Sequence, residues 1–392
     1  MFEELGLDDE NNASLTENDD GEGLPLPAQN SLCLGHERVE QNLLDSHHQG
    51  QLPHALIFAG PPGIGKATFA YRFIRFLLSP AGKPPEQLES AESLFGDDLP
   101  PPEKKQSFDI PDQETLFSRI GAGGHPDLRV LERRVDERTG KLRTTLDLSE
   151  IREIRSFMQL TPAEAGWRIA LIDEAERMNH FSQNSLLKIL EEPPDNSLLI
   201  IVTSSAGALI PTIRSRSRIY NFRALSMDNM SVLIQKMDPQ IPHSDRLLLA
   251  RLSHGQIGLA QKYYESGGLQ FFSRLVSILS NWPDLNRDEI YKLADQLSAK
   301  GQEAQYESFR DILKWILMEL VRAKANEIQD PDLVPGSDID TSALNRLYND
   351  MTKQELIRLH DKIEHYMKQV DDSFLDKRQA VLNTFFKLTD TK

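Results

Sequence analysis

The chain has 392 residues, enough for roughly two to four domains, and its 39% hydrophobic and 27% charged residues are typical of globular proteins. No stretch approaches the roughly 18 uninterrupted apolar residues of a membrane helix, and the N-terminus lacks the basic start and apolar core of a secretory signal. The single cysteine, Cys33, excludes an intrachain disulfide and a cysteine-rich zinc site. We therefore expect a cytoplasmic protein without zinc or a membrane partner.

The net charge of −16 is unevenly distributed along the chain. Residues 1–30 contain nine acidic residues and no Lys or Arg, which predicts a disordered acidic tail. The other 362 residues carry a net charge of −7, so the folded part is mildly acidic. This balance argues against a stand-alone DNA-binding module and favours action on DNA only within a larger assembly.

Between Ser31 and about Arg223, short apolar strand-like runs alternate with helical patterns, which predicts a parallel sheet covered by helices. Residues 79–127 interrupt this pattern with a density of proline and glycine that indicates a long, mobile insertion. The expected strands are Ala55–Ala59, Leu128–Leu131, Arg168–Ile172 and Leu198–Thr203. The expected helices are Glu37–His48, Lys66–Leu78, Ser149–Leu160 and Ser182–Glu192, the last of which ends at two prolines.

From about Leu225 onward the sequence becomes helical. Apolar residues recur at helical spacing in Phe271–Leu279, Ile290–Leu297, Phe309–Val321 and Leu356–Val370. This part of the chain therefore predicts a helical bundle or collar.

A glycine-rich loop, Gly60-Pro61-Pro62-Gly63-Ile64-Gly65-Lys66, lies between an expected strand and an expected helix. This is the GxxxxGK pattern of a phosphate-binding loop, in which backbone N–H groups, the helix N-terminus and the lysine favour an anionic phosphate. The alternative is a glycine-rich strand–helix turn that binds no ligand.

The residue after the lysine of such a loop usually offers a Ser or Thr hydroxyl to Mg²⁺, and here it is Ala67. Thr68 comes one residue later, which rotates its side chain by about 100° around the helix. We therefore expect ATP to bind weakly or not at all and leave Mg²⁺ binding open.

Two carboxylates, Asp173 and Glu174, end the apolar strand at Arg168–Ile172. In phosphate-loop ATPases the first such carboxylate helps to hold Mg²⁺ and the second polarises the attacking water. The alternative is the solvated acidic start of a helix, which the helix dipole also favours. Their position downstream of the phosphate loop favours the nucleotide role, in working or vestigial form.

Three arginines, Arg214, Arg216 and Arg218, recur at a spacing of two and would point to one side of a strand. They are consistent with a solvated basic edge or a patch that contacts phosphate. A more specific hypothesis is an arginine finger that stabilises charge on a neighbouring subunit's γ-phosphate. The spacing does not choose between these alternatives.

Taken together, the motifs GPPGIGKAT, LIDEAERMN, NSLLKILEEPP and PTIRSRSR resemble the clamp-loader branch of the AAA+ ATPases, and within it the delta-prime type of DNA polymerase III subunit. The resemblance is nearly continuous from Leu52 to Arg223. It implies a RecA-like AAA+ α/β domain with a parallel sheet at residues 31–224, a small helical lid at 225–265 and an all-α collar domain at 266–392.

The resemblance also assigns roles to single residues. It places Gly60, Gly63, Gly65, Lys66, Ala67 and Thr68 in the phosphate loop, Asp173 and Glu174 in the second acidic motif, and Thr203 (or the adjacent Ser204) at the first sensor. It implies that Arg216 acts in trans on a neighbour's ATP. Gly258 stands where motor subunits carry a second-sensor arginine, and the 79–127 insertion stands where many relatives carry a zinc module.

These assignments predict a largely non-hydrolysing subunit of a DNA-directed DNA polymerase holoenzyme that acts in DNA replication. Its expected partners are gamma/tau and delta subunits in a hetero-pentamer, a sliding clamp, and primed DNA bound through the complex. The alternative is an ATP-hydrolysing motor subunit of the gamma/tau type, which the GK loop and the Asp173-Glu174 pair favour.

Overall fold

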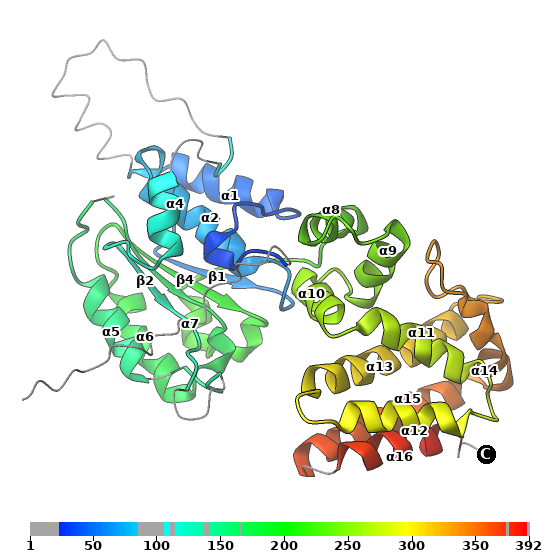
Figure 1. Ribbon diagram of the computed structural model, residues 1–392. Helices are drawn as coiled ribbons and strands as arrows, with labels where there is room; N and C mark the ends of the chain where they lie inside the picture. The colour runs from blue at the N-terminus through cyan, green and yellow to red at the C-terminus, as the bar shows by residue number, and fades with distance from the viewer. Residues whose placement is uncertain are drawn as a thin grey trace, which may run out of the picture.

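The computed structural model of this protein describes residues 23–84, 106–109, 114–136, 142–146, 148–164, 166–373 and 376–389. Residues 1–22 of the predicted acidic tail and residues 85–105 and 110–113 of the predicted insertion lie outside this range. The helices and strands fall into a sheet domain followed by a helical part (Figure 1).

Five parallel strands form one sheet in the order β2-β3-β4-β1-β5. The strands are β1 (Ala55–Ala59), β2 (Leu128–Leu131), β3 (Arg168–Ile172), β4 (Ser197–Thr203) and β5 (Arg218–Asn221). Three of them have the predicted bounds and β4 begins one residue early, but the sequence analysis missed β5. All residues of β1, β3 and β4 are buried, which explains their unbroken apolar runs.

Helices cover both faces of the sheet, so its buried residues fall into two clusters (Figure 1). One face carries α1 (Glu37–His48), α2 (Lys66–Leu78) and α4 (Glu114–Gly121), and the other carries α5 (Leu148–Met158), α6 (His180–Glu191) and α7 (Pro211–Ser215). Alternate residues of β1 serve opposite faces: Leu56 and Phe58 pack under α2, and Ile57 packs toward α6. Short 3₁₀ turns lie at Pro27–Gln29, Pro80–Gly82, Ala175–Arg177, Ala206–Ala208 and Thr341–Leu344.

Residues 23–30, predicted as the end of a disordered tail, instead pack against the fold. We call residues 23–34 the N-terminal strap. The guanidinium of Arg75 donates hydrogen bonds to the carbonyl oxygens of Ala28 (3.0 Å) and Asn30 (2.7 Å). Leu24 packs against the core of the helical part. The tail prediction is wrong for these residues because their apolar side chains and carbonyl groups find buried partners.

Part of the predicted insertion is also ordered. Helix α4 lies within it, and Phe108 is 1% exposed, with its ring centroid 4.8 Å from that of Phe73 and 5.2 Å from that of Phe76. Residues 79–127 therefore include segments that complete the core on the α2 face of the sheet, which their proline and glycine content did not indicate.

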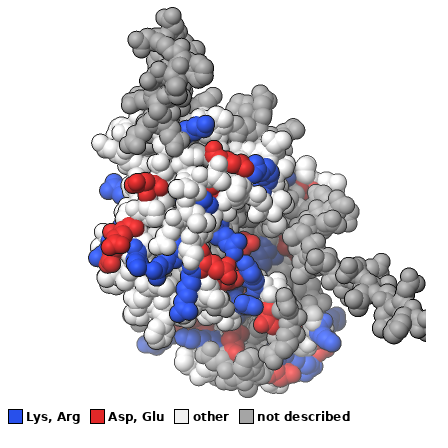
Figure 2. Space-filling view, turned by 90° about the vertical axis from the view of Figure 1, so that its left-hand side faces the viewer, with Lys and Arg blue, Asp and Glu red and all other residues white. Residues whose placement is uncertain are grey.

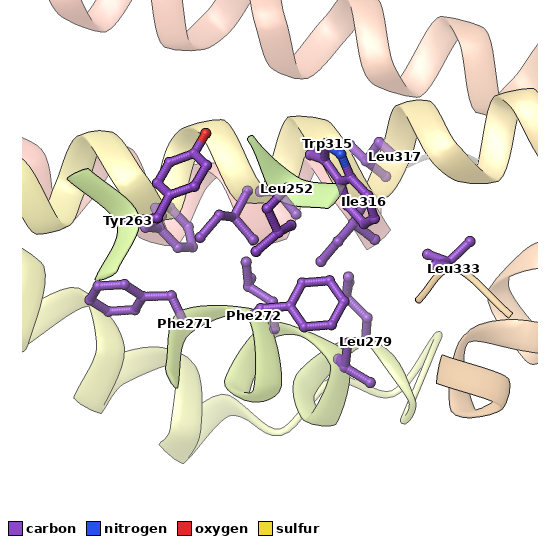
Figure 3. Close-up of a cluster of buried hydrophobic side chains, with 14 of the residues drawn as sticks. Leu252, Tyr263, Phe271, Phe272, Leu279, Trp315, Ile316, Leu317 and Leu333 are labelled. Carbon is purple, nitrogen blue, oxygen red and sulfur yellow. The ribbon is translucent and has the colours of Figure 1, made fainter. Parts of the chain in front are cut away.

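The remainder of the described chain is helical and shares one apolar core. Figure 3 shows part of this core, in which Phe271, Phe272 and Leu279 of α11 face Trp315 and Ile316 of α13. Its helices are α8 (Met227–Met237), α9 (His243–Leu252), α10 (Ile257–Glu265), α11 (Gly268–Leu279), α12 (Arg287–Ser298), α13 (Glu303–Ala325), α14 (Asn345–Asp350), α15 (Lys353–Ser373) and α16 (Lys377–Thr389). The predicted fold class, a parallel α/β domain followed by helices, is confirmed, while the division into lid and collar at residue 265 stays a prediction.

No helix within the described residues combines the length and the apolar character needed to cross a membrane.

Candidate functional site

The glycine-rich loop connects β1 to α2 as the sequence predicts, and close approach explains its glycines. A Cβ atom on Gly60 would lie 2.4 Å from the carbonyl oxygen of Phe222, which is too close for any side chain. Gly63 and Gly65 have φ angles of 67° and 89°, in the left-handed region that glycine adopts without strain. Gly65 is also the N-cap of α2, so the loop ends at a helix N-terminus.

Lys66 turns back onto its own loop. Its Nζ donates hydrogen bonds to the carbonyl oxygens of Gly60 (2.7 Å) and Pro61 (2.6 Å). Burial lowers the pKa of Lys66, and the nearby carboxylates of Asp173 and Glu176 oppose that shift. The loop thus supplies its own acceptors for the lysine, which would have to release them to reach a phosphate.

The next two residues also lie beside the loop. Ala67 and Thr68 both line the pocket beside the loop, where Ala67 offers no hydroxyl oxygen to a metal ion. Thr68 is buried.

Asp173 and Glu174 stand at the end of β3 and face different surroundings. Asp173 lines the pocket, and its Oδ1 accepts a hydrogen bond from the backbone N–H of Glu174 at 2.8 Å. Burial raises the pKa of Asp173 to about 6. Glu174 has a φ of 48° and forms a two-point ion pair with Arg133, in which Nη2 lies 2.8 Å from Oε1 and Nε donates to Oε2.

The first-sensor candidate, Thr203, is engaged within its own loop. Its hydroxyl donates to the carbonyl oxygen of Ser205 at 3.1 Å and accepts from the backbone N–H of Ser205. Glu176 accepts a hydrogen bond from the backbone N–H of Ser204 at 3.0 Å, which joins the second acidic motif to the end of β4. Glu176 was not singled out from the sequence.

Helix α10 lines one side of the pocket and contacts the glycine-rich loop. The backbone N–H of Gly258 donates to the carbonyl oxygen of Gly63 at 2.9 Å, and a Cβ on Gly258 would lie 3.2 Å from the Cα of Gly63. The cavity between the loop, the acidic motif, the N-terminal strap and α10 has a volume of about 430 Å³. Its apolar end is lined by leucine and isoleucine side chains: Leu24, Leu26, Leu32, Leu34, Leu225, Leu233 and Ile257.

The substitution Asp173→Asn is expected to raise the free energy of unfolding at pH 8 by about 1–3 kcal/mol. The raised pKa means that the folded chain holds this proton more tightly than the unfolded chain, so wild-type stability falls as the pH rises from about 4 through about 6. Asparagine keeps the oxygen that accepts from Glu174 and removes the buried charge.

Urea unfolding at pH 4.5 and pH 8 measures this effect, with the exposed Asp195→Asn as the control. If Asp173→Asn raised the free energy of unfolding by the same amount at both pH values, the effect could not be assigned to the charge of Asp173.

Arg216 lies apart from the pocket, at the C-cap of α7. Its Nη2 lies 3.0 Å from Oε1 of Glu191, and its side chain is 38% exposed. The three arginines do not share a strand: Arg214 lies on α7, Arg216 caps it, and Arg218 begins the strand β5. Pro211 at the first position of α7 favours the helix, which breaks the spacing of two.

The side of the sheet domain at its β2 edge carries charges of both signs. Figure 2 shows Lys and Arg interspersed with Asp and Glu over this face. Arg129 pairs with Glu153 at 2.7 Å, and Arg134 pairs with Glu150 at 3.1 Å. These pairs agree with the mildly acidic balance of the folded part of the sequence.

Sequence reasoning also missed Arg133. Leu131 of β2 pairs with Ile172 of β3, so two residues beyond each partner bring Arg133 opposite Glu174. The signal was the short distance of Arg133 from the end of an expected strand, but the neighbour of that strand was unknown.

Comparison with known proteins relates the chain to replication proteins. A family profile described as "DNA polymerase III, delta subunit" matches residues 103–226. The chain is 28% identical over 217 residues to DNA polymerase III subunit gamma/tau of Mycobacterium tuberculosis, covering 55% of this chain and 32% of that protein. It is 29% identical over 168 residues to DNA polymerase III subunit delta' of Pseudomonas aeruginosa, covering 43% and 42%.

The subunit delta' of Escherichia coli is 24% identical over 240 residues, covering 61% of this chain and 63% of that protein. The chain thus spans from about a third to just under two thirds of the length of these curated relatives. Among solved structures, a gamma-subunit-related protein of Thermotoga maritima aligns over 91% of this chain and 99% of its own, with 14% identity and a TM-score of 0.36.

Proposed function

Because the chain belongs to the family of DNA polymerase III clamp-loader subunits of the delta-prime and gamma/tau type, we propose that it is a delta-prime-like subunit that acts in DNA replication and hydrolyses little or no ATP itself. It assembles with gamma/tau-type and delta-type subunits in a hetero-pentamer. It supplies Arg216 to ATP bound by a neighbouring subunit, and the complex loads a sliding clamp on primed DNA.

The observation that carries the proposal is the ion pair between Arg133 and Glu174. A general base must be free to accept a proton from the attacking water. Both carboxylate oxygens of Glu174 accept hydrogen bonds from one guanidinium, so this side chain is engaged where a motor subunit would need it. Arginine stays protonated at all working pH values, so the pair does not release by titration of Arg133.

The residues of the pocket fit a phosphate better than they fit a hydrolysing Mg²⁺–ATP site. The loop glycines, the start of α2 and Lys66 form the cradle that phosphate requires. Position 67 offers no hydroxyl ligand to a metal ion, and position 258 holds a glycine, where a Cβ would lie 3.2 Å from the Cα of Gly63. Nucleotide binding is therefore weak, and no hydrolytic step is assigned to this pocket.

The second function is an ATP-hydrolysing motor subunit of the gamma/tau type. The complete GxxxxGK loop and the partly buried Asp173 favour it, because both residue patterns are typical of a nucleotide-hydrolysing site. It requires that Arg133 leave Glu174 during turnover.

The isolated full-length chain is expected to show no Mg²⁺-dependent ATP hydrolysis above the background of its Lys66→Ala variant. A titration with a fluorescent ATP analogue, with and without Mg²⁺, is expected to show weak binding that the metal does not strengthen, because position 67 offers no ligand. Steady turnover by the isolated chain that Lys66→Ala abolishes would establish the motor function and overturn the proposal.

A further inference from the structure

Arg216 is anchored by the end of a second helix. Glu191 is the last residue of α6, and its Oε1 lies 3.0 Å from Nη2 of Arg216 at the C-cap of α7. Glu192 is the C-cap, and Pro193 and Pro194 follow it and prevent α6 from continuing. The position of the carboxylate along the helix is therefore set by where the sequence ends that helix.

The same helix holds the start of the arginine-bearing segment. Gln183 is 5% exposed, and its Oε1 accepts a hydrogen bond from the backbone N–H of Ile210 at 2.8 Å. Its Nε2 donates to the carbonyl oxygen of Ala208 at 3.2 Å. Helix α6 thus contacts the segment before α7 through a buried amide and the residue after α7 through a carboxylate, which fixes α7 at both ends.

The anchoring is selective. Arg214 and Arg218 are also exposed, but no ion pair of either side chain is recorded among the described residues. On α6, the neighbouring Glu192 is exposed and likewise has no recorded ion pair within the described part of the chain. One arginine of three and one glutamate of two therefore form the ion pair between the end of α6 and the end of α7.

We propose that Glu191 is a positioning residue for Arg216, which rests on the proposed role of Arg216 in trans. A guanidinium carries five N–H donors in a rigid plane. The carboxylate engages Nη2, whereas Nη1 makes only a long contact of 3.4 Å with the carbonyl oxygen of Thr212. Glu191 therefore holds one edge of the plane and leaves another edge for a neighbour's γ-phosphate, so less side-chain freedom is lost when the phosphate binds.

The test uses the complex reconstituted with its gamma/tau-type and delta-type subunits, with ATP hydrolysis followed in the first turnover. Glu191→Gln is expected to slow hydrolysis at the site that faces Arg216 by about two- to tenfold, with KM for ATP and assembly of the complex unchanged. Glu191→Asp, which keeps the charge, is expected to recover part of the rate. The matched control, Glu192→Gln, is expected to behave as wild type.

A double-mutant cycle separates positioning from a general structural effect. Glu191→Gln is expected to have no further effect when Arg216→Ala is already present, because its action passes through that side chain. If Arg216→Ala slows hydrolysis but Glu191→Gln leaves it unchanged or accelerates it, the positioning role is overturned and the proposed function stands. If Arg216→Ala itself has no effect, the proposed function fails and the positioning role fails with it.

Discussion

Replacing Arg216 with alanine is expected to lower ATP hydrolysis about 10³-fold or more at the one site of the reconstituted complex that faces this chain. The guanidinium would stabilise charge that develops on the transferred phosphate, and alanine removes that charge entirely. A pre-steady-state burst measures the effect, because its amplitude counts the sites that fire. The amplitude is expected to fall by one ATP per complex.

The control for this experiment is Arg214→Ala, which removes another exposed arginine, from the short helix α7 that Arg216 caps. It is expected to leave the burst unchanged, which would exclude an effect of net charge on assembly. A burst of full amplitude with Arg216→Ala would show that this residue does not act on a neighbour's nucleotide, and the function proposed for the chain would have to be abandoned.

The substitution Phe272→Ala is expected to lower the free energy of unfolding of the helical part by about 3–5 kcal/mol. Phe272 is fully buried, and its ring centroid lies 5.9 Å from that of Trp315. Truncation removes apolar contacts and leaves a cavity between α11 and α13 that the surrounding helices cannot fill. Denaturant unfolding followed by tryptophan fluorescence measures the loss.

Phe386 supplies the matched control, because it is 54% exposed on α16. Phe386→Ala is expected to change the free energy of unfolding by no more than about 0.5 kcal/mol. If Phe272→Ala cost less than about 1 kcal/mol, the apolar core of the helical part would not be a principal source of stability.

Much of the sheet domain could be predicted because its strands are buried on both faces. A run such as Ala55–Ala59 must be apolar throughout when helices cover both sides, and glycine and proline mark its ends. The loop at residues 60–66 was recognisable because close backbone approach at Gly60 and positive φ angles at Gly63 and Gly65 require glycine. The family resemblance carried by the four motifs is confirmed by the replication proteins to which the chain is related.

The features that escaped prediction depend on contacts between distant segments. The strap at residues 23–34 directly follows an acidic segment, and the buried Arg75 on α2 gives the carbonyl groups of Ala28 and Asn30 a partner. The short strand β5 has alternating polar residues at the edge of the sheet, so no apolar run announces it. The pairing of Arg133 with Glu174 follows from which strands are neighbours, and a single sequence does not contain that information.

The contact between Gly258 and Gly63 mechanically couples the two sides of the cleft beside the glycine-rich loop. One peptide hydrogen bond joins the roof of the cleft to its floor, and the roof belongs to the same apolar core as the C-terminal helices. If those helices are held in a ring of subunits, a tilt of the sheet domain must break this hydrogen bond before the cleft can open. The pocket, which in an ATPase would hold the nucleotide, would then act in this chain as a joint that resists bending.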